Sequence, residues 1–270
     1  MWSFEMVAAM LAVGAAAGII AGVFGVGGGT ILVPLVLWIL QMQGAENFQY
    51  AQHIAIGTSF AVMVFTSFAS ARAQYKRQAV DMDVLRAMVP GVLCGVAAGA
   101  LVAQYLPNKG LQVFFTLFIA ILAVRALLGI KPTPERQLPG RCGLFGMGGL
   151  FGLLSSWIGI GGGSLTVPYL TFCNVPVHRA VGTSAALGWP IAAAGTLGYA
   201  WAGWNQDGLP EGSAGFVYLP AVGILAAATL LSAPLGVRLS HKLPADKLKK
   251  GFGILLLLIA LRMAWKIVQS

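Results

Sequence analysis

The sequence predicts an all-α integral membrane protein made of two inverted repeats, each a glycine-broken helix hairpin followed by three transmembrane helices. The first reason is composition: of the 270 residues, 58% are hydrophobic and 9% are charged, and the mean hydropathy is +0.82. A soluble domain of this length would need far more charge on its surface. The second reason is the placement of the basic residues. The third is a glycine-rich motif that occurs twice.

The apolar stretches favour helices over a β-barrel, because they are continuous and do not alternate with polar residues. Leu111–Ile130 carries a single charge, and so does Gly251–Met263. Small residues also recur at four-residue spacing, as they do in helices that pack closely inside membranes. We expect six single crossings, over Ile54–Ala71, Ala87–Tyr105, Leu111–Ile130, Ala180–Ala202, Phe216–Gly236 and Gly251–Val268.

The basic residues indicate how these crossings are oriented. Twelve of the 17 lysines and arginines lie in three loops, around 72–86, 131–141 and 238–250, whereas the loops at 41–52, 107–110 and 204–213 have almost none. Cytoplasmic loops of membrane proteins carry the excess of positive charge. The three basic loops are therefore expected inside, next to membrane lipid, and both termini outside. This placement accounts for the net charge of +9 without nucleic-acid binding.

Two longer apolar segments, Met6–Leu40 and Gly143–Cys173, are each interrupted by a glycine cluster. Each segment is too long for one ordinary crossing, and the part after the glycines is too short for a second. The alternation of sides also requires each segment to begin and end on the same side of the membrane. We therefore predict two helix hairpins that are broken at their glycines.

The hairpins belong to a duplication that covers nearly the whole chain. Residues 25–35 (GVGGGTILVPL) match 159–169 (GIGGGSLTVPY), and 53–59 (HIAIGTS) match 178–184 (HRAVGTS). We place the N-terminal repeat at 1–130, a cytoplasmic linker at 131–141 and the C-terminal repeat at 142–270. The basic loop 72–86 corresponds to the acidic loop 204–213, so the repeats are expected to be inverted. Inverted repeats with broken helices are typical of secondary transporters.

The glycine clusters predict a binding site for a small anion. A glycine run is a poor helix interior but permits tight turns. A helix that restarts at Thr30 or Ser164 would aim free N–H groups and a partial positive charge at the break, and the hydroxyl could cap that start. The alternative is that the glycines only allow close packing, which we prefer for the glycines spaced by four. The predicted binding residues are Gly27, Gly28, Gly29, Thr30, Gly161, Gly162, Gly163 and Ser164; the packing glycines are Gly14, Gly18, Gly91, Gly95 and Gly99.

The second repeated motif adds polar residues near the start of the next helices. Its hydroxyls could contribute to the site, although such side chains often bond to their own helix backbone. Its histidines are candidate proton or anion partners, with an interfacial position at a helix start as the alternative. These residues are Thr58, Ser59, Thr183 and Ser184, with His53 and His178.

The acidic residues and cysteines exclude other kinds of site. All eight carboxylates fall in predicted loops or termini, which argues against a cation site or a carboxylate proton relay in the membrane. Cys94, Cys142 and Cys173 lack the spacing of metal ligands. The sequence contains neither a His-x-x-x-His motif nor a phosphate-binding loop, so we expect no metal site and no enzymatic activity.

The two glycine motifs and the trailing Gly-Thr-Ser motifs resemble those of the sulfite exporter TauE/SafE family of membrane permeases. The resemblance spans both halves at matching positions. It implies a bacterial inner-membrane transporter of sulfur-containing anions, such as sulfite and small organosulfonates including sulfoacetate, that works without a cofactor. The leading hypothesis is secondary transport by alternating access, and an anion channel with the same glycine-lined site is the alternative. A homodimer is one oligomeric state that the sequence leaves open.

Overall fold

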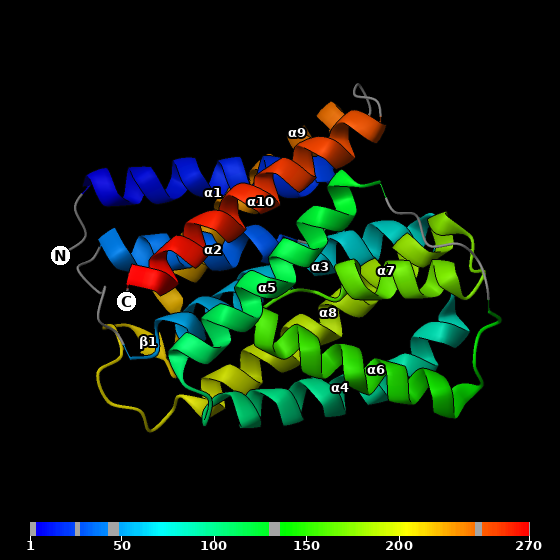
Figure 1. The fold of residues 1–270 in the computed structure, drawn as a ribbon, viewed down its shortest axis with the longest axis horizontal. Coiled ribbons are helices and arrows are strands. Elements are labelled where there is room, and N and C mark those ends of the chain that lie inside the picture. The colour runs from blue at the N-terminus through cyan, green and yellow to red at the C-terminus, as the bar shows by residue number, and fades with distance from the viewer. Residues whose placement is uncertain (1–3, 25–27, 43–48, 130–135, 241–244, 270) are drawn as a thin grey trace.

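The computed structural model describes residues 4–24, 28–42, 49–129, 136–240 and 245–269 (Figure 1). These residues form helices joined by short connections and one two-stranded antiparallel hairpin. The elements are α1 (Phe4–Phe24), α2 (Gly29–Met42), α3 (Ala51–Lys76), α4 (Met82–Ala103), α5 (Asn108–Leu127), α6 (Arg141–Ile158), α7 (Gly163–Phe172), α8 (Val177–Ala202), β1 (Ser213–Ala214), β2 (Val217–Tyr218), α9 (Leu219–Ser240) and α10 (Ala245–Gln269).

The all-α prediction is confirmed. The six predicted crossings correspond to α3, α4, α5, α8, α9 and α10, and the two predicted hairpins correspond to α1 with α2 and α6 with α7. In the described part of the chain, α3, α4, α5 and most of α9 and α10 are long and apolar enough to cross a membrane. The chain is therefore a multi-pass membrane protein.

The predicted ends of two crossings are wrong. Helix α3 continues to Lys76, so that Arg72 and Lys76 lie on its last turns and not in a loop. A helix that continues out of the membrane keeps its backbone hydrogen bonds, and the basic side chains of its last turns are solvated there. Helix α9 begins at Leu219, because Phe216 lies in the turn of the β1–β2 hairpin.

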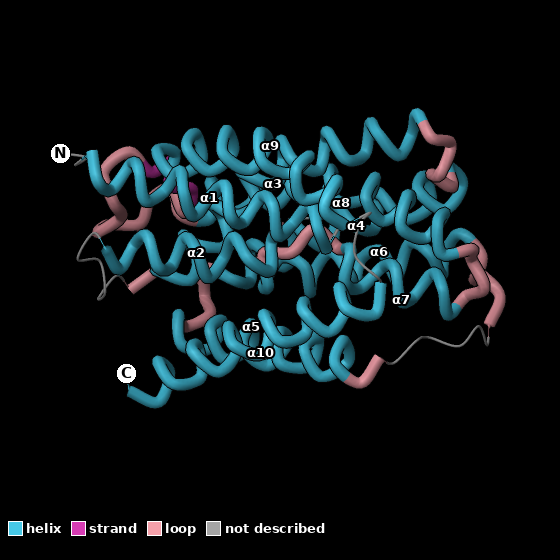
Figure 2. Tube along the Cα trace, turned by 90° about the horizontal axis from the view of Figure 1, so that it is seen from above, coloured by secondary structure: helices cyan, strands magenta, loops and turns pink. Residues whose placement is uncertain are grey.

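The helices pack in pairs that are related by the duplication. Helix α1 packs along α9, and its counterpart α6 packs along α4, the counterpart of α9. Helices α3 and α8 form the central pair, and Figure 2 shows α5 and α10 side by side along one face of the molecule. The central pair is antiparallel, because Phe60 lies against Gly195 whereas Ser67 lies against Gly188.

The four-spaced glycines provide close contacts between paired helices, as predicted. A Cβ atom on Gly95 would collide with the carbonyl oxygen of Gly149, and one on Gly14 would lie 2.9 Å from Cβ of Ala228. Gly18, Gly91 and Gly99 are equally close to the facing helix. Inside a membrane, such small residues let backbones approach and gain van der Waals contact.

The two hairpins enter the molecule from opposite ends. Helix α1 begins and α2 ends where α10 ends, whereas α6 begins and α7 ends at the other end of the molecule (Figure 1). The return arms are short, with 14 residues in α2 and 10 in α7. At 1.5 Å per residue they span about 21 Å and about 15 Å, against about 30 Å for a bilayer core. Both return arms are therefore shorter than a full crossing.

Candidate functional site

The glycine breaks of the two halves touch at the centre of the molecule. A Cβ atom on Gly29 would collide with the carbonyl oxygen of Gly159 and lie 2.9 Å from Cα of Ile160. Gly159 in turn packs against Val33 of α2 and Ile56 of α3. Only glycine allows the backbones of both breaks to come this close.

Each break ends one helix and starts another in a geometry that glycine favours. Helix α6 stops at Ile158, and Gly159 follows with a φ of 72°. The residue before each short arm is also left-handed, with a φ of 80° at Gly28 and 75° at Gly162. A side chain is strained in this region, which explains why glycine stands at these positions.

Within the described residues, the first backbone amides of the short arms have no backbone hydrogen-bond partner. The first helical bonds of α7 run from the N–H groups of Leu165 and Thr166 to the carbonyl oxygen of Gly162. Gly28 accepts the equivalent bonds at the start of α2. The amides of Gly163 and Ser164, and those of the matching residues in α2, therefore precede the hydrogen-bond ladder. They carry the positive end of the helix dipole, which attracts anions.

The predicted capping of these helices by Thr30 and Ser164 is wrong. Glycines occupy the position before each arm, and both helices begin one residue earlier than expected. Thr30 and Ser164 are therefore the second residue of their helix, and not the N-cap residue whose side-chain oxygen would accept from the first amides. Neither hydroxyl has a hydrogen-bond partner among the described residues.

Further hydroxyls around the breaks are also buried and unpartnered. Thr166 and Ser184 are each 1% exposed, and neither hydroxyl has a hydrogen-bond partner in the described part of the chain. The Ser184 hydroxyl would be the nearest neighbour of a Cβ atom on Gly163, at 3.8 Å, and the Thr166 hydroxyl would lie 3.5 Å from one on Gly162. An unsatisfied buried polar group costs about 1–3 kcal/mol. Such a group is retained where a ligand can satisfy it.

Thr166 was missed by the sequence reasoning. Its counterpart in the first copy of the motif is Leu32, so that a comparison of the copies hides it. The difference between the copies could have revealed Thr166, because it is a polar residue at a position that is apolar in the first copy.

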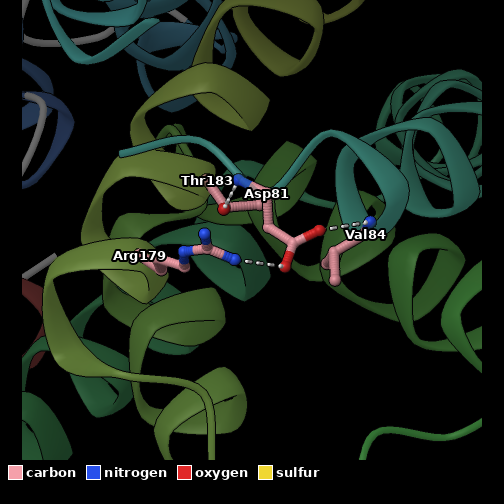
Figure 3. A network of polar contacts seen from close by, with 4 residues as sticks. All are labelled: Asp81, Val84, Arg179 and Thr183. Atoms are coloured by element: carbon pink, nitrogen blue, oxygen red, sulfur yellow. Dashed lines mark hydrogen bonds and ion pairs between the residues drawn. The ribbon is translucent and has the colours of Figure 1, made fainter. Parts of the chain in front are cut away.

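The Gly-Thr part of the second motif joins the two halves. The hydroxyl of Thr183 accepts a hydrogen bond of 2.8 Å from the backbone N–H of Asp81, just before α4 (Figure 3). Asp81 also caps α4 at the N–H of Val84 and pairs with Arg179 at 3.8 Å. In the matching place Thr58 accepts a bond of 3.0 Å from the N–H of Tyr218, just before α9.

The glycines of this motif make room for the same contacts. A Cβ atom on Gly57 would collide with the Phe216 carbonyl, and one on Gly182 with the Ala79 carbonyl. Thr58 and Thr183 are therefore committed to backbone partners in the opposite half, and we leave them out of the proposed binding site.

The serine of this motif faces the breaks. The Ser59 hydroxyl donates to the carbonyl oxygen of Gly159 at 3.3 Å, whereas Ser184 lies beside Gly163. The structure thus places Gly29 and Ser59 against Gly159, and Ser184 beside Gly163. The other predicted residues that it describes at the breaks are Gly28, Thr30, Gly161, Gly162 and Ser164. Gly27 lies outside the described residues.

The two histidines have different surroundings although their motifs match. His53 is fully buried, with Nε2 2.8 Å from the carbonyl oxygen of Ala103 and its ring against Tyr50 and Phe216. It lies six residues before Ser59, which is about 9 Å along α3, so that it does not reach the breaks. His178 is exposed in the first turn of α8.

The described residues near the breaks carry neither acidic nor basic side chains. Asp81, Asp83, Asp207 and Glu211 lie at the start of α4 or in the connection from α8 to α9. Within the described ranges, no group of three or more His, Cys, Asp or Glu residues is placed to hold a metal ion. The polar groups of the site are therefore backbone dipoles and neutral hydroxyls.

Comparison with known proteins assigns a family. The model of the sulfite exporter TauE/SafE family matches residues 10–263. The chain belongs to the TauE/SafE family. The match includes both glycine breaks and both Gly-Thr-Ser motifs, which confirms the resemblance stated from the sequence.

Other TauE/SafE-like chains are named as transporters. A probable membrane transporter protein of Haemophilus influenzae is 33% identical, over 97% of this chain and the whole of the relative. Another from Methanocaldococcus jannaschii is 25% identical over 89% of this chain and 88% of its own. A third from Xylella fastidiosa is 27% identical over 94% and 93% of the two chains. No solved structure matches the chain.

Proposed function

We propose that this protein is a secondary transporter of a small anion, sulfite or a small organosulfonate, which binds where the two glycine breaks meet. The observation that carries the proposal is that helix-start amides and buried hydroxyls, both unpartnered among the described residues, lie around the two breaks at the centre of the molecule. These groups come from α2, α7 and α8, and all of them can donate hydrogen bonds to an anion. The protein's place in the family supports a sulfur-containing anion.

A tetrahedral or pyramidal oxyanion suits this set of groups. Its oxygens only accept hydrogen bonds, and both the amides and the hydroxyls can donate. Hydrogen bonds to a charged group are worth about 1.5–3 kcal/mol each, so that a few of them can replace the hydration of a small anion. The hydroxyls of Thr30, Ser164 and Ser184 would gain the partners that they lack without a ligand.

We propose that the anion crosses by alternating access between two inverted repeats. The antiparallel central pair α3–α8 and the exchanged pairs α1–α9 and α4–α6 support the inversion. Thr30, Ser59 and Ser184 are at most 1% exposed, whereas Gly163 and Ser164 are partly exposed. The burial of the first three favours a carrier over the alternative, an anion channel through the same glycines. We place the protein in the bacterial inner membrane.

Removal of an unpartnered hydroxyl should weaken transport but not the fold. We expect Ser184→Ala to reduce sulfite transport at low concentration about 10- to 100-fold, because one hydrogen bond to the anion is lost. The melting temperature should stay equal or rise, since a buried unsatisfied group is removed. Flux into proteoliposomes and thermal unfolding of the purified protein measure the two effects.

Thr116→Val is the matched control for Ser184→Ala. The Thr116 hydroxyl is also buried in a membrane helix, but it donates to its own backbone, at Gln112, over 2.7 Å. This variant should transport normally. If the Ser184→Ala protein transports sulfite at the wild-type rate at every concentration, the hydroxyls are not part of the binding site.

The inverted arrangement makes a prediction about the two sides of the membrane. Single cysteines at Gln206 and at Lys250, in a cysteine-free chain, should react with an impermeant thiol reagent from opposite sides of intact cells. We expect Gln206→Cys to react from outside and Lys250→Cys only after the cells are opened. Reaction of both from the same side would contradict the inverted repeats.

A further inference from the structure

A polar cavity lies at the end of the molecule where α10 ends. Its volume is about 520 Å³, and its walls come from the end of α2, the start of α3, the turn between α4 and α5, and the last turns of α10. Helices from both halves therefore build it. Gln41, Tyr50, Asn108 and Gln112 supply neutral polar groups to the wall.

The charged residues on the described wall of this cavity are both positive. Lys109, in the first turn of α5, and Lys266, in the last turn of α10, both line it. No Asp or Glu belongs to its described wall, and neither lysine forms an ion pair within the described residues. Two ammonium groups in a concave surface raise the local concentration of small anions.

The cavity at the opposite end has a different balance of charge. It has a volume of about 290 Å³ and lies at the matching place in the second half, where α7 ends and α8 begins. Its Arg179 is paired with Asp81, which also lines it. Each end of the molecule therefore has a cavity. Of these two, only the cavity around Lys109 and Lys266 has an excess of positive charge on its described wall.

One buried polar side chain lies between the positive cavity and the glycine breaks. Gln52 follows Ala51 of the cavity wall, is fully buried, and lacks partners for both polar atoms of its side chain in the described part of the protein. Residues seven apart share a helix face, so Gln52 and Ser59 lie on the same side of α3, about 10 Å apart along its axis. The backbone N–H of Gln52 also donates a hydrogen bond of 2.7 Å to Oδ1 of Asn108, which lines the cavity.

We propose that the cavity around Lys109 and Lys266 is an anion-recruiting vestibule, which binds small oxyanions and sulfonates weakly before they reach the central site. The inference rests on the proposed anion transport and adds a second binding site to it. The shared chemistry is that of a small anionic head: a free sulfite or sulfonate, or the phosphate of an anionic lipid.

The test measures the sign of the local potential with single cysteines in a chain freed of Cys94, Cys142 and Cys173. Gln112→Cys places a thiol one turn after Lys109, and Gln137→Cys places one in the opposite cavity. Each is reacted in detergent with a sulfonate-bearing and with a trimethylammonium-bearing methanethiosulfonate. For each cysteine we compare the reaction rate of the anionic reagent with that of the cationic one. At low ionic strength we expect this ratio to be about tenfold higher at Gln112→Cys than at Gln137→Cys, because the charges of Lys109 and Lys266 attract the anionic reagent and repel the cationic one.

The lysine variants show whether Lys109 and Lys266 cause this excess. Adding Lys109→Gln and Lys266→Gln should remove it, as should molar salt. Lys250→Gln, at the other end of α10, should leave it unchanged. Equal ratios in the two cavities, or an excess that survives the double substitution, would overturn the proposal.

Two further experiments show whether the cavity binds a free anion or a lipid headgroup. They also test the vestibule independently of the proposed transport function. Millimolar sulfoacetate, a sulfonate that does not react with the reagents, should slow the reaction at Gln112→Cys, also when Gly163→Leu blocks the central site. If phosphatidylglycerol abolishes the excess and sulfoacetate has no effect, the cavity is a lipid site and the vestibule is refuted. If the excess and the sulfoacetate protection persist in a protein that transports neither sulfite nor sulfoacetate, the vestibule stands and the proposed transport falls.

Discussion

Replacing Gly163 with leucine is expected to stop transport and leave the protein folded. A Cβ atom here would have Ser184 as its nearest neighbour, at 3.8 Å, and the backbone of Gly163 is not in the left-handed region. The position therefore tolerates a side chain, unlike Gly29 or Gly162. A leucine would fill the space between the free amides of α7 and the Ser184 hydroxyl, where we place the anion.

The expected loss for Gly163→Leu is at least about 100-fold in sulfite flux, since several hydrogen bonds to the anion are blocked together. Proteoliposome flux measures it, and thermal unfolding and gel filtration check the fold. Gly146→Leu is the matched control: Gly146 lies on α6 in the same half, is exposed, and has no atom of a facing residue within 4 Å of the place that a Cβ atom would take. Normal flux in Gly163→Leu would show that the anion binds elsewhere.

Replacing Gly95 with leucine is expected to destabilise the fold, in contrast to Gly163→Leu, which should stay folded and lose transport. A Cβ atom on Gly95 would collide with the carbonyl oxygen of Gly149 and lie 2.9 Å from its Cα atom, so that α4 and α6 would have to separate along their length. Overpacking of a rigid interior costs about 1–3 kcal/mol, and a backbone collision lies at or above the upper end. The stability measured by unfolding in detergent should fall by at least about 3 kcal/mol.

Cys94→Leu is the control for Gly95→Leu. Cys94 is the preceding residue of α4 and is exposed, so that its side chain points away from α6. This substitution should leave both stability and yield unchanged. A Gly95→Leu protein with wild-type stability would contradict the close packing of α4 on α6.

The fold was predictable to the level of its elements because membrane helices depend on local properties of the sequence. The length and apolarity of 111–130 locate α5 without reference to the rest of the chain. The glycine clusters at 25–29 and 159–163 predict the breaks, since glycine is a poor helix interior and favours tight turns. What local patterns do not contain is which helices pair, and the exchanged pairs α1–α9 and α4–α6 appear only in the structure.

The candidate site was predictable in its centre but not in its surroundings. The glycines and Ser184 were recognised because duplication repeats them. The role of Thr58 and Thr183 was not, since their partners, the N–H groups of Tyr218 and Asp81, lie more than 100 residues away in the other half. The cavity around Lys109 and Lys266 was missed for the same reason, because it is assembled from both halves.

Sulfite counterflow in proteoliposomes tests the central claim most directly. Vesicles with purified protein are loaded with unlabelled sulfite and diluted into a trace of labelled sulfite, with sulfoacetate and taurine compared as competitors. We expect a transient accumulation of label above its equilibrium level, abolished by Gly163→Leu and preserved in Gly146→Leu. Flux that is linear in concentration without counterflow would indicate a channel. The absence of any flux of these anions would contradict the proposed function.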